Sequence, residues 1–208
     1  MNQTEQRIAQ SEGEVRVLKS QLGQSERKKE NLMQEDLEKI CRRQEILVKL
    51  LQIMQSAENL PKAMNEMLAE IGKFSGVSRV YCLEKNADET TIRCTYDWSN
   101  TGITRIIDNF QIRPVKDFQP WFELFAAGQI INTSDINTLI PQMFEIVNRF
   151  GVKSYLVFPL TDNGVHYGLV GFHDCVSNRE WDENEVELLG SLSKIISAAR
   201  RRFRIEQE

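Results

Sequence analysis

The chain has 208 residues, of which 41% are apolar and 27% are charged, as is usual for a soluble globular protein. Its formal net charge of −4 gives no general attraction to nucleic acid or to an anionic membrane, so neither is expected as a partner. No apolar run approaches the roughly 20 residues that cross a bilayer, and the first residues lack a signal-peptide core; we expect a cytoplasmic protein without direct membrane insertion.

A long helix is predicted over residues 4–54, which contain no proline and are rich in Glu, Gln, Lys, Arg and Leu. Its apolar residues follow two heptad phases, separated by a stutter of a heptad plus four residues between Leu22 and Met33. This pattern favours a parallel homodimeric coiled coil over a single amphipathic helix lying on its own domain. The first phase contains Ile8, Val15, Leu18 and Leu22, and the second contains Met33, Leu37, Ile40, Leu47, Leu51 and Met54.

After residue 43 the same helix gains a second apolar stripe, made of Ile46, Leu50 and Ile53. Two adjacent stripes predict two partners, namely the dimer mate and the sheet of the helix's own domain. We therefore divide the chain into a coiled-coil signalling helix, residues 1–43, and a sensory domain, residues 44–208.

A second helix is predicted after Asn59, which caps it, with Pro61 in its first turn and Gly76 at its left-handed end. Strands follow at residues 78–84 and 90–98, and then an irregular segment leads to extended chain at residues 110–115. The remaining elements before residue 151 are a short helix, a short strand and another helix, at residues 119–127, 130–132 and 139–150.

The next two strands, residues 154–160 and 165–174, are joined by Asn163-Gly164, a pair that favours positive φ at both turn positions. The first of them is apolar almost throughout, which predicts a buried place near the middle of a sheet. A central hairpin covered by helices indicates an α+β domain with an antiparallel sheet.

The last helix is predicted over residues 181–207, with Asp182 and Glu185 in a capping-box arrangement. It shows no stop signal, so we expect it to continue into a further segment of a longer protein. Like the first helix it carries two apolar stripes, and homodimerisation is expected through both helices. The predicted dimer interface comprises Met33, Leu37, Ile40, Leu47, Leu51, Met54 and Leu192.

The order of these elements resembles a GAF domain, a relative of PAS domains, over roughly residues 44–203. This resemblance implies a GAF-like antiparallel sheet flanked by helices. It also implies a non-enzymatic sensory module of a signal-transduction protein, such as a sensor histidine kinase of a two-component system, in which ligand binding moves the first and last helices. The motifs that carry it are Gly151-Val152-Lys153-Ser154, Phe158-Pro159-Leu160, Asn163-Gly164, Gly168-Leu169-Val170-Gly171-Phe172 and Arg179-Glu180-Trp181.

The resemblance places a small ligand between the sheet and residues 110–150. Aromatic side chains with a few polar groups are the usual lining of such a site. The alternative is that the aromatic residues are ordinary core while Thr133 and Asp135 cap a turn, which would make the protein a ligand-free dimerisation scaffold. The candidate lining residues are Trp98, Phe110, Trp121, Ile131, Thr133, Asp135, Tyr155 and His173.

The residues by which similar domains bind cyclic nucleotides or bilins are missing from this sequence. The Asn-Lys pair and Phe of cyclic-nucleotide-binding relatives are absent from residues 173–185, and no cysteine lies between Cys94 and Cys175 to attach a bilin pigment. His166 and His173 lie seven residues apart on one strand, so they should face opposite sides and form no metal site there. No cofactor is expected.

A redox enzyme of the free methionine sulfoxide reductase type is a third alternative. Cys82 and Cys94 are predicted on neighbouring strands, where the two thiols could lie close together. However, residues 99–120 lack the cysteines that such reductases carry in the loop before the pocket helix. The basic cluster Arg200-Arg201-Arg202-Arg204 suits phosphate binding, but on a helix that leaves a domain such a cluster is more often a solvated face or a complement to the helix C-terminal dipole.

Overall fold

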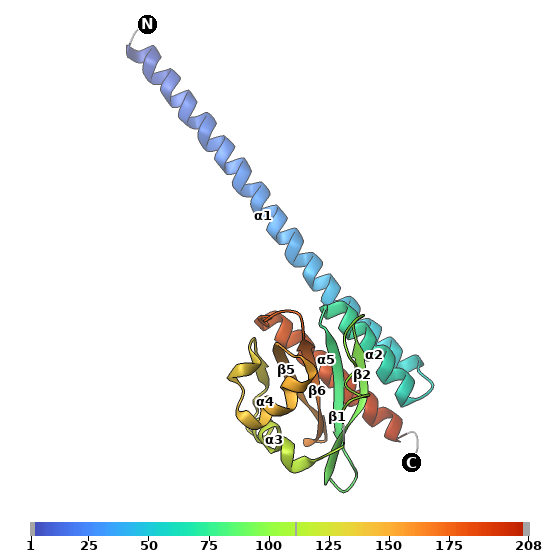
Figure 1. Cartoon of the computed structure of the whole chain (residues 1–208). Coiled ribbons are helices and arrows are strands. Elements are labelled where there is room, and N and C mark those ends of the chain that lie inside the picture. Colours follow the sequence, from blue (N-terminus) through green and yellow to red (C-terminus); the bar gives the residue numbers. More distant parts are fainter. Residues whose placement is uncertain (1–2, 111, 206–208) are drawn as a thin grey trace. The chain divides into compact units, whose positions relative to one another are not determined.

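The computed structural model describes residues 3–110 and 112–205, with the side chains of residue 19 and of residues 21–110 and 112–203 (Figure 1). It contains two compact units, Met1–Glu45 and Ile46–Glu208. The second unit holds the sheet and all of the shorter helices. In the described part of the chain, no helix combines the length and the apolar character needed to cross a bilayer.

The sheet has six strands in the order β3-β2-β1-β6-β5-β4, and every neighbouring pair is antiparallel. The predicted hairpin contributes β6, which pairs with β1 at the centre of the sheet, and β5, which lies next to the edge strand β4. At its turn φ is 50° at Asn163 and 81° at Gly164, as the Asn-Gly turn requires. This topology confirms the predicted α+β, GAF-like fold. The strands are β1 (Arg79–Lys85), β2 (Thr91–Ser99), β3 (Arg113–Pro114), β4 (Ile131–Thr133), β5 (Ser154–Asp162) and β6 (Val165–Asp174).

Helices begin and end close to their sequence signals. Asn59 accepts a hydrogen bond from the N–H of Lys62 at 3.0 Å, and Gly76 has φ 65°. Asp182 accepts one from the N–H of Glu185 at 2.9 Å, but the Glu185 carboxylate pairs with Arg179, so the capping box does not close. The helices are α1 (Gln3–Ser56), α2 (Leu60–Ser75), α3 (Gln119–Ala126), α4 (Pro141–Val147) and α5 (Glu183–Ile205), with 3₁₀ turns η1 (Val115–Phe118), η2 (Ile136–Thr138) and η3 (Asn148–Phe150).

Two predicted elements between β2 and β5 are shorter than expected. The extended chain predicted at residues 110–115 contains only the two-residue strand β3 before η1 begins at Val115. The helix predicted at residues 139–150 is divided into α4 and η3, and Pro141 opens α4. Both differences lie in the segment that covers one face of the sheet.

The opposite face of the sheet packs against α2, α5 and the last turns of α1. Ile46 and Leu50 of α1 are buried there with Phe158 and Phe172, so the second stripe of α1 does cover its own sheet. Leu192 of α5 is fully buried in this core, contrary to its assignment to a dimer interface. The reason is that α5 lies against both the sheet and α2, which together take up its two apolar stripes.

The heptad stripe of α1 is exposed in the single chain. Met33, Leu37 and Ile40 are 75%, 60% and 52% exposed, and Leu51 is also exposed, whereas Leu47 and Met54 pack partly against their own core. An exposed apolar stripe of this kind suits contact with another helix. The side chains of Ile8, Val15 and Leu18, and that of Arg204 in the basic cluster, lie outside the described residues. The coiled-coil dimer remains a prediction.

Candidate ligand-binding site

A buried aromatic cluster lies on the face of the sheet that α3 and α4 cover. The Tyr155 hydroxyl accepts hydrogen bonds from Trp121 Nε1 at 3.0 Å and from the Tyr81 hydroxyl at 3.2 Å. The His173 ring packs 4.6 Å from the Tyr81 ring and 5.1 Å from the Tyr155 ring. Burial raises the pKa of Tyr155 to about 12, so the phenol is neutral and can serve this network as donor or acceptor. The structure thus brings Trp121, Tyr155 and His173 into one cluster.

These side chains fill the interior almost completely. A small cavity among them has a volume of about 10 Å³ and is lined by Tyr81, Phe110, Phe118, Phe150, Tyr155 and His173 among others. That volume is at the lower limit for a single water molecule. In this conformation the interior has no room for a metabolite.

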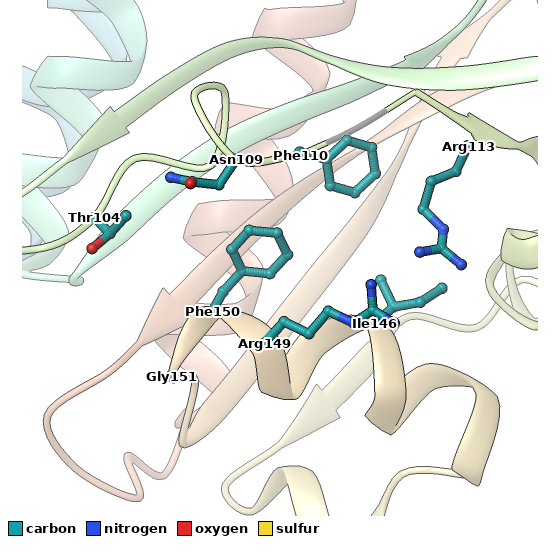
Figure 2. Close-up of a pocket in the computed structure, with 8 residues that line it drawn as sticks. All are labelled: Thr104, Asn109, Phe110, Arg113, Ile146, Arg149, Phe150 and Gly151. Carbon is teal, nitrogen blue, oxygen red and sulfur yellow. The ribbon is translucent and has the colours of Figure 1, made fainter.

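A much larger cleft opens beside this cluster, between the segment after β2 and the end of α4. Its volume is about 570 Å³, within the usual range for small-molecule sites. The rings of Phe110 and Phe150 stack with centroids 6.3 Å apart, and Arg113 and Arg149 reach into the same space around them (Figure 2). The lining residues are Thr104, Asn109, Phe110, Arg113, Ile146, Arg149, Phe150 and Gly151.

Behind the cleft lies Arg79, whose side chain is almost completely buried. Its guanidinium donates to the carbonyl oxygen of Thr104, lies 3.0 Å from Nδ1 of His173, and sits 5.9 Å from the centroid of the Phe150 ring. Thr104 and Phe150 both line the cleft, so this guanidinium lies directly behind its wall. Burial is the larger cause and the charge of Arg79 the smaller cause that lower the pKa of His173 well below its usual value, so the imidazole is neutral.

One wall of the cleft is held in place by Asp97, the fully buried carboxylate near the end of β2. It accepts hydrogen bonds from the N–H groups of Ile106 and Ile107, at 2.8 and 3.3 Å, and from the guanidinium of Arg105 at 2.6 Å. These bonds fix the chain that runs from β2 to Phe110. On the other wall, Gly151 ends η3 with φ 65°, a conformation that suits glycine.

Of the predicted lining residues, only Phe110 belongs to this cleft. Sequence reasoning missed Tyr81, although alternation along its strand would have placed it on this face of the sheet. It also missed Arg79, for which a charged residue at the start of an apolar strand was the available signal. Arg113 lies in a segment predicted only as extended chain and Arg149 near the end of the helix predicted at residues 139–150, and nothing in the sequence set either residue apart.

Three other predicted residues have local structural roles. Trp98 lies on the opposite face of the sheet against α2, where a Cβ atom on Gly72 would come within 2.0 Å of its ring. Thr133 Oγ1 donates to the carbonyl oxygen of Asp135, whose carboxylate caps η2 by accepting from the N–H of Asn137 at 3.0 Å. These two residues therefore follow the capping alternative. Ile131 is buried in the core beneath α3.

Two register irregularities decide which side chains share a face of the sheet, and one of them makes the expectation that His166 and His173 face opposite sides wrong. Cys82 and Cys94 lie on opposite faces of the sheet, because Cys94 pairs with Leu83 beside an irregularity between Cys82 and Leu83. The second irregularity lies between β5 and β6, where Thr161 pairs with His166 and Leu160 pairs with Gly168, so β6 has one extra residue. The bulge reverses the alternation, so His166 packs against Phe125 on the same face as His173.

The two cysteines that suggested the redox alternative therefore do not share one face of the sheet. Burial raises the pKa of both Cys82 and Cys94, which disfavours the reactive thiolate form. Among the described side chains, no group of three or more His, Cys, Asp or Glu is arranged to hold a metal ion. The cleft is therefore the site whose form suits a ligand.

The GAF domain family model matches residues 59–199. The chain is 33% identical over 81 residues to a protein of Synechocystis sp. named as a methyl-accepting chemotaxis protein, and 26% identical over 161 residues to the circadian input-output histidine kinase CikA of Thermosynechococcus vestitus. These alignments cover 38% and 71% of this chain. They span only 8% and 21% of the two relatives.

Solved structures show the same fold at low sequence identity. The phycoerythrobilin-bound GAF domain of a cyanobacterial phytochrome has a TM-score of 0.70 and 17% identity, covering 80% of this chain and 98% of that one. A methyl-accepting chemotaxis protein, residues 122 to 287, has a TM-score of 0.62 and 13% identity, and the match covers 75% of this chain and 97% of that one. The GAF domain of an Acinetobacter phosphoenolpyruvate-protein phosphotransferase has a TM-score of 0.61 and 12% identity, and the match covers 79% of this chain and 96% of that one.

Proposed function

Because the chain belongs to the GAF domain family, we propose that it is a non-enzymatic sensory module of a signalling protein. In this proposal a small molecule binds beside the sheet, and its binding moves α1 and α5, which carry the signal to an output domain elsewhere in a longer protein. The observation that carries the proposal is the cleft of about 570 Å³ on the face of the sheet opposite to these helices. The histidine kinase and chemotaxis relatives, in which the matched region is a small part, support a signalling role.

A continuous set of contacts joins the cleft to the helices. Gly151 lines the cleft and leads into β5, whose Thr161 N–H donates to Ser197 Oγ of α5 at 3.2 Å. Further along α5, the guanidinium of Arg202 donates to the carbonyl oxygen of Met54 in α1. A shift of η3 on ligand binding would therefore displace β5, then α5, then the end of α1.

The proposed signalling unit is a homodimer joined through α1. Met33, Leu37 and Ile40 expose an apolar stripe that a second copy of the helix would bury. The stutter between Leu22 and Met33 gives this helix a region able to hold two packing phases, the bistable element that a switch requires. All four cysteines are free thiols, which suits the reducing cytoplasm, where we place the protein.

The filled interior favours one alternative, a ligand-free dimerisation scaffold. In a scaffold the cleft would be an inert surface feature and its occupation would leave α1 unchanged. Replacing Asn109, an exposed lining residue, with tryptophan fills part of the cleft and separates the two proposals. The readout is the rate of disulfide formation between Leu37→Cys copies in a Cys41→Ser background, because residue 37 lies on the proposed dimer stripe.

The sensory proposal expects Asn109→Trp to change this rate at least twofold. Gln129→Trp places the same ring at an exposed position outside the cleft and should leave the rate unchanged. Equal rates in the two tryptophan variants would favour the scaffold. Native mass spectrometry of the purified protein would add a direct search for a co-purified small molecule.

A further inference from the structure

We propose that the ligand of the cleft is an anion, a carboxylate- or phosphate-bearing small molecule with a flat apolar body. This inference rests on the proposed function, because it assigns a chemical class to the same site. Two of the eight lining residues are cationic and none is acidic. Clefts with one sign of charge concentrate ligands of the opposite sign.

The guanidinium behind the wall of the cleft has unusual surroundings. Arg79 is 1% exposed, yet no carboxylate of the described residues forms an ion pair with it. Its Nε has no hydrogen-bond partner there, and its contacts are the carbonyl oxygen of Thr104, neutral His173 and the Phe150 ring. A buried charge without a counter-ion is costly, and an anion bound next to it would reduce that cost.

The acidic side chains on the neighbouring strands are engaged elsewhere. On β2, Asp97 accepts from Arg105 and from two backbone N–H groups. On β6, Asp174 accepts from the N–H groups of Val176 and Ser177, at 2.8 and 2.9 Å. Neither carboxylate forms an ion pair with Arg79, so its guanidinium is open to pairing with a ligand.

The two arginines of the cleft differ in how much charge they offer. The guanidinium of Arg113 lies 2.9 Å from the Asp117 carboxylate, which neutralises part of its charge. Arg149 is exposed and forms no ion pair with any residue in the described part of the chain. Planar guanidinium groups bind carboxylates and phosphates in a two-pronged geometry, so Arg149 is the natural first contact for either group.

The body of the ligand follows from the rest of the lining. The rings of Phe110 and Phe150 are nearly parallel, at an interplanar angle of 24°, and Ile146 adds an apolar floor. A flat apolar or aromatic body fits against these rings while its charged group meets the arginines, as Figure 2 shows for the arrangement of the side chains.

Three naphthalene probes test the charge requirement with one ring system. The probes 1-naphthyl phosphate and 1-naphthoate carry the two candidate anionic groups, and 1-naphthamide is the neutral control. Dissociation constants are measured by calorimetry on the full chain. We expect the better anionic probe to bind at least tenfold more tightly than 1-naphthamide, because hydrogen bonds to charged groups contribute more than neutral ones. The anionic probe with the lower dissociation constant shows whether the cleft prefers a phosphate or a carboxylate.

Variants then assign that preference to the cleft. Arg149→Gln should lower the anionic preference at least fivefold, whereas Arg93→Gln removes the same charge from an exposed strand position outside the cleft and should leave it unchanged. Arg79→Lys keeps the buried charge but loses the planar group, and it should also weaken the anionic probes. Equal binding of 1-naphthamide, equal effects of Arg149→Gln and Arg93→Gln, or no binding of any probe would overturn the inference. The Leu37→Cys cross-linking readout would still test the sensory proposal independently of these results.

Discussion

Arg79 Nη1 lies 3.0 Å from Nδ1 of His173, and the two residues are directly opposite each other on β1 and β6. Because a guanidinium only donates, Nδ1 must accept this bond and the imidazole proton must sit on Nε2. Both side chains are almost completely buried. The pair thus places a permanent charge beside a histidine that stays neutral.

The first prediction concerns the pH dependence of stability. Because the pKa of His173 in the folded state lies well below its usual value, the unfolded chain binds a proton below about pH 6.5 that the folded chain does not. The free energy of unfolding should therefore fall as the pH falls from 7.5 to 5.5, by on the order of 1 kcal/mol from this one group. Urea denaturation measures the free energy of unfolding of the wild type and of His173→Gln at both pH values. The variant should lose less stability between pH 7.5 and 5.5 than the wild type.

His166→Gln is the matched control for this experiment. The pKa of His166 is also lowered, by burial and then by Lys85, but this residue is only half-buried and its shift is smaller. Its replacement should remove less of the pH dependence than His173→Gln. If the wild type and His173→Gln lose equal stability on acidification, the neutral state assigned to His173 is wrong.

The elements of the fold were predictable because their signals are local. Asn163-Gly164 determines the turn of the hairpin, and Asn59 and Gly76 determine the ends of α2. Faces of the sheet were predictable only where the alternation is unbroken, since a bulge beside Tyr167 moves His166 to the face of His173.

The candidate site was less accessible to sequence reasoning. Trp121, Tyr155 and His173, predicted to line a pocket, lie together in a filled cluster. The open cleft is built by the segment after β2 and by η3, where charged and aromatic side chains follow no periodic pattern. Their proximity depends on tertiary contacts such as those of Asp97, which join residues that have no sequence signature in common.

A second prediction concerns the close packing of α2 on the sheet. A Cβ atom at Gly72 would lie 2.0 Å from the Trp98 ring, so Gly72→Ala should destabilise the domain by about 1–3 kcal/mol, despite the better helix propensity of alanine. Gly23→Ala is the control, because nothing lies within 4 Å of the corresponding position in α1. Thermal denaturation should show Gly72→Ala/Trp98→Leu to be less destabilised than the sum of its single variants. An unchanged stability of Gly72→Ala would contradict the packing described.

The third prediction ranks the partners of the buried carboxylate at the cleft wall. Asp97→Ala leaves the N–H groups of Ile106 and Ile107 without their acceptor and should cost about 2–4 kcal/mol of unfolding free energy. Arg105→Ala should cost no more than about 1 kcal/mol, since that side chain is half exposed. Amide hydrogen exchange should show faster exchange at Ile106 and Ile107 in Asp97→Ala. Equal costs for the two variants would mean that the ion pair, and not the backbone bonds, holds this wall.

The last prediction tests the apolar stripe of α1. Leu37 is exposed in the single chain, and in a parallel coiled coil the two copies would bury each other. Each buried leucine stabilises the pair by roughly 2 kcal/mol, so Leu37→Asp should raise the dimer dissociation constant at least about 100-fold. Sedimentation equilibrium over a range of protein concentrations measures this constant, and far-UV circular dichroism checks that the helix persists. Gln24→Asp adds the same charge at an exposed polar position of the helix and should change the constant little. A wild-type chain that stays monomeric at micromolar concentration would remove the dimer, and with it the proposed route from the cleft to an output domain.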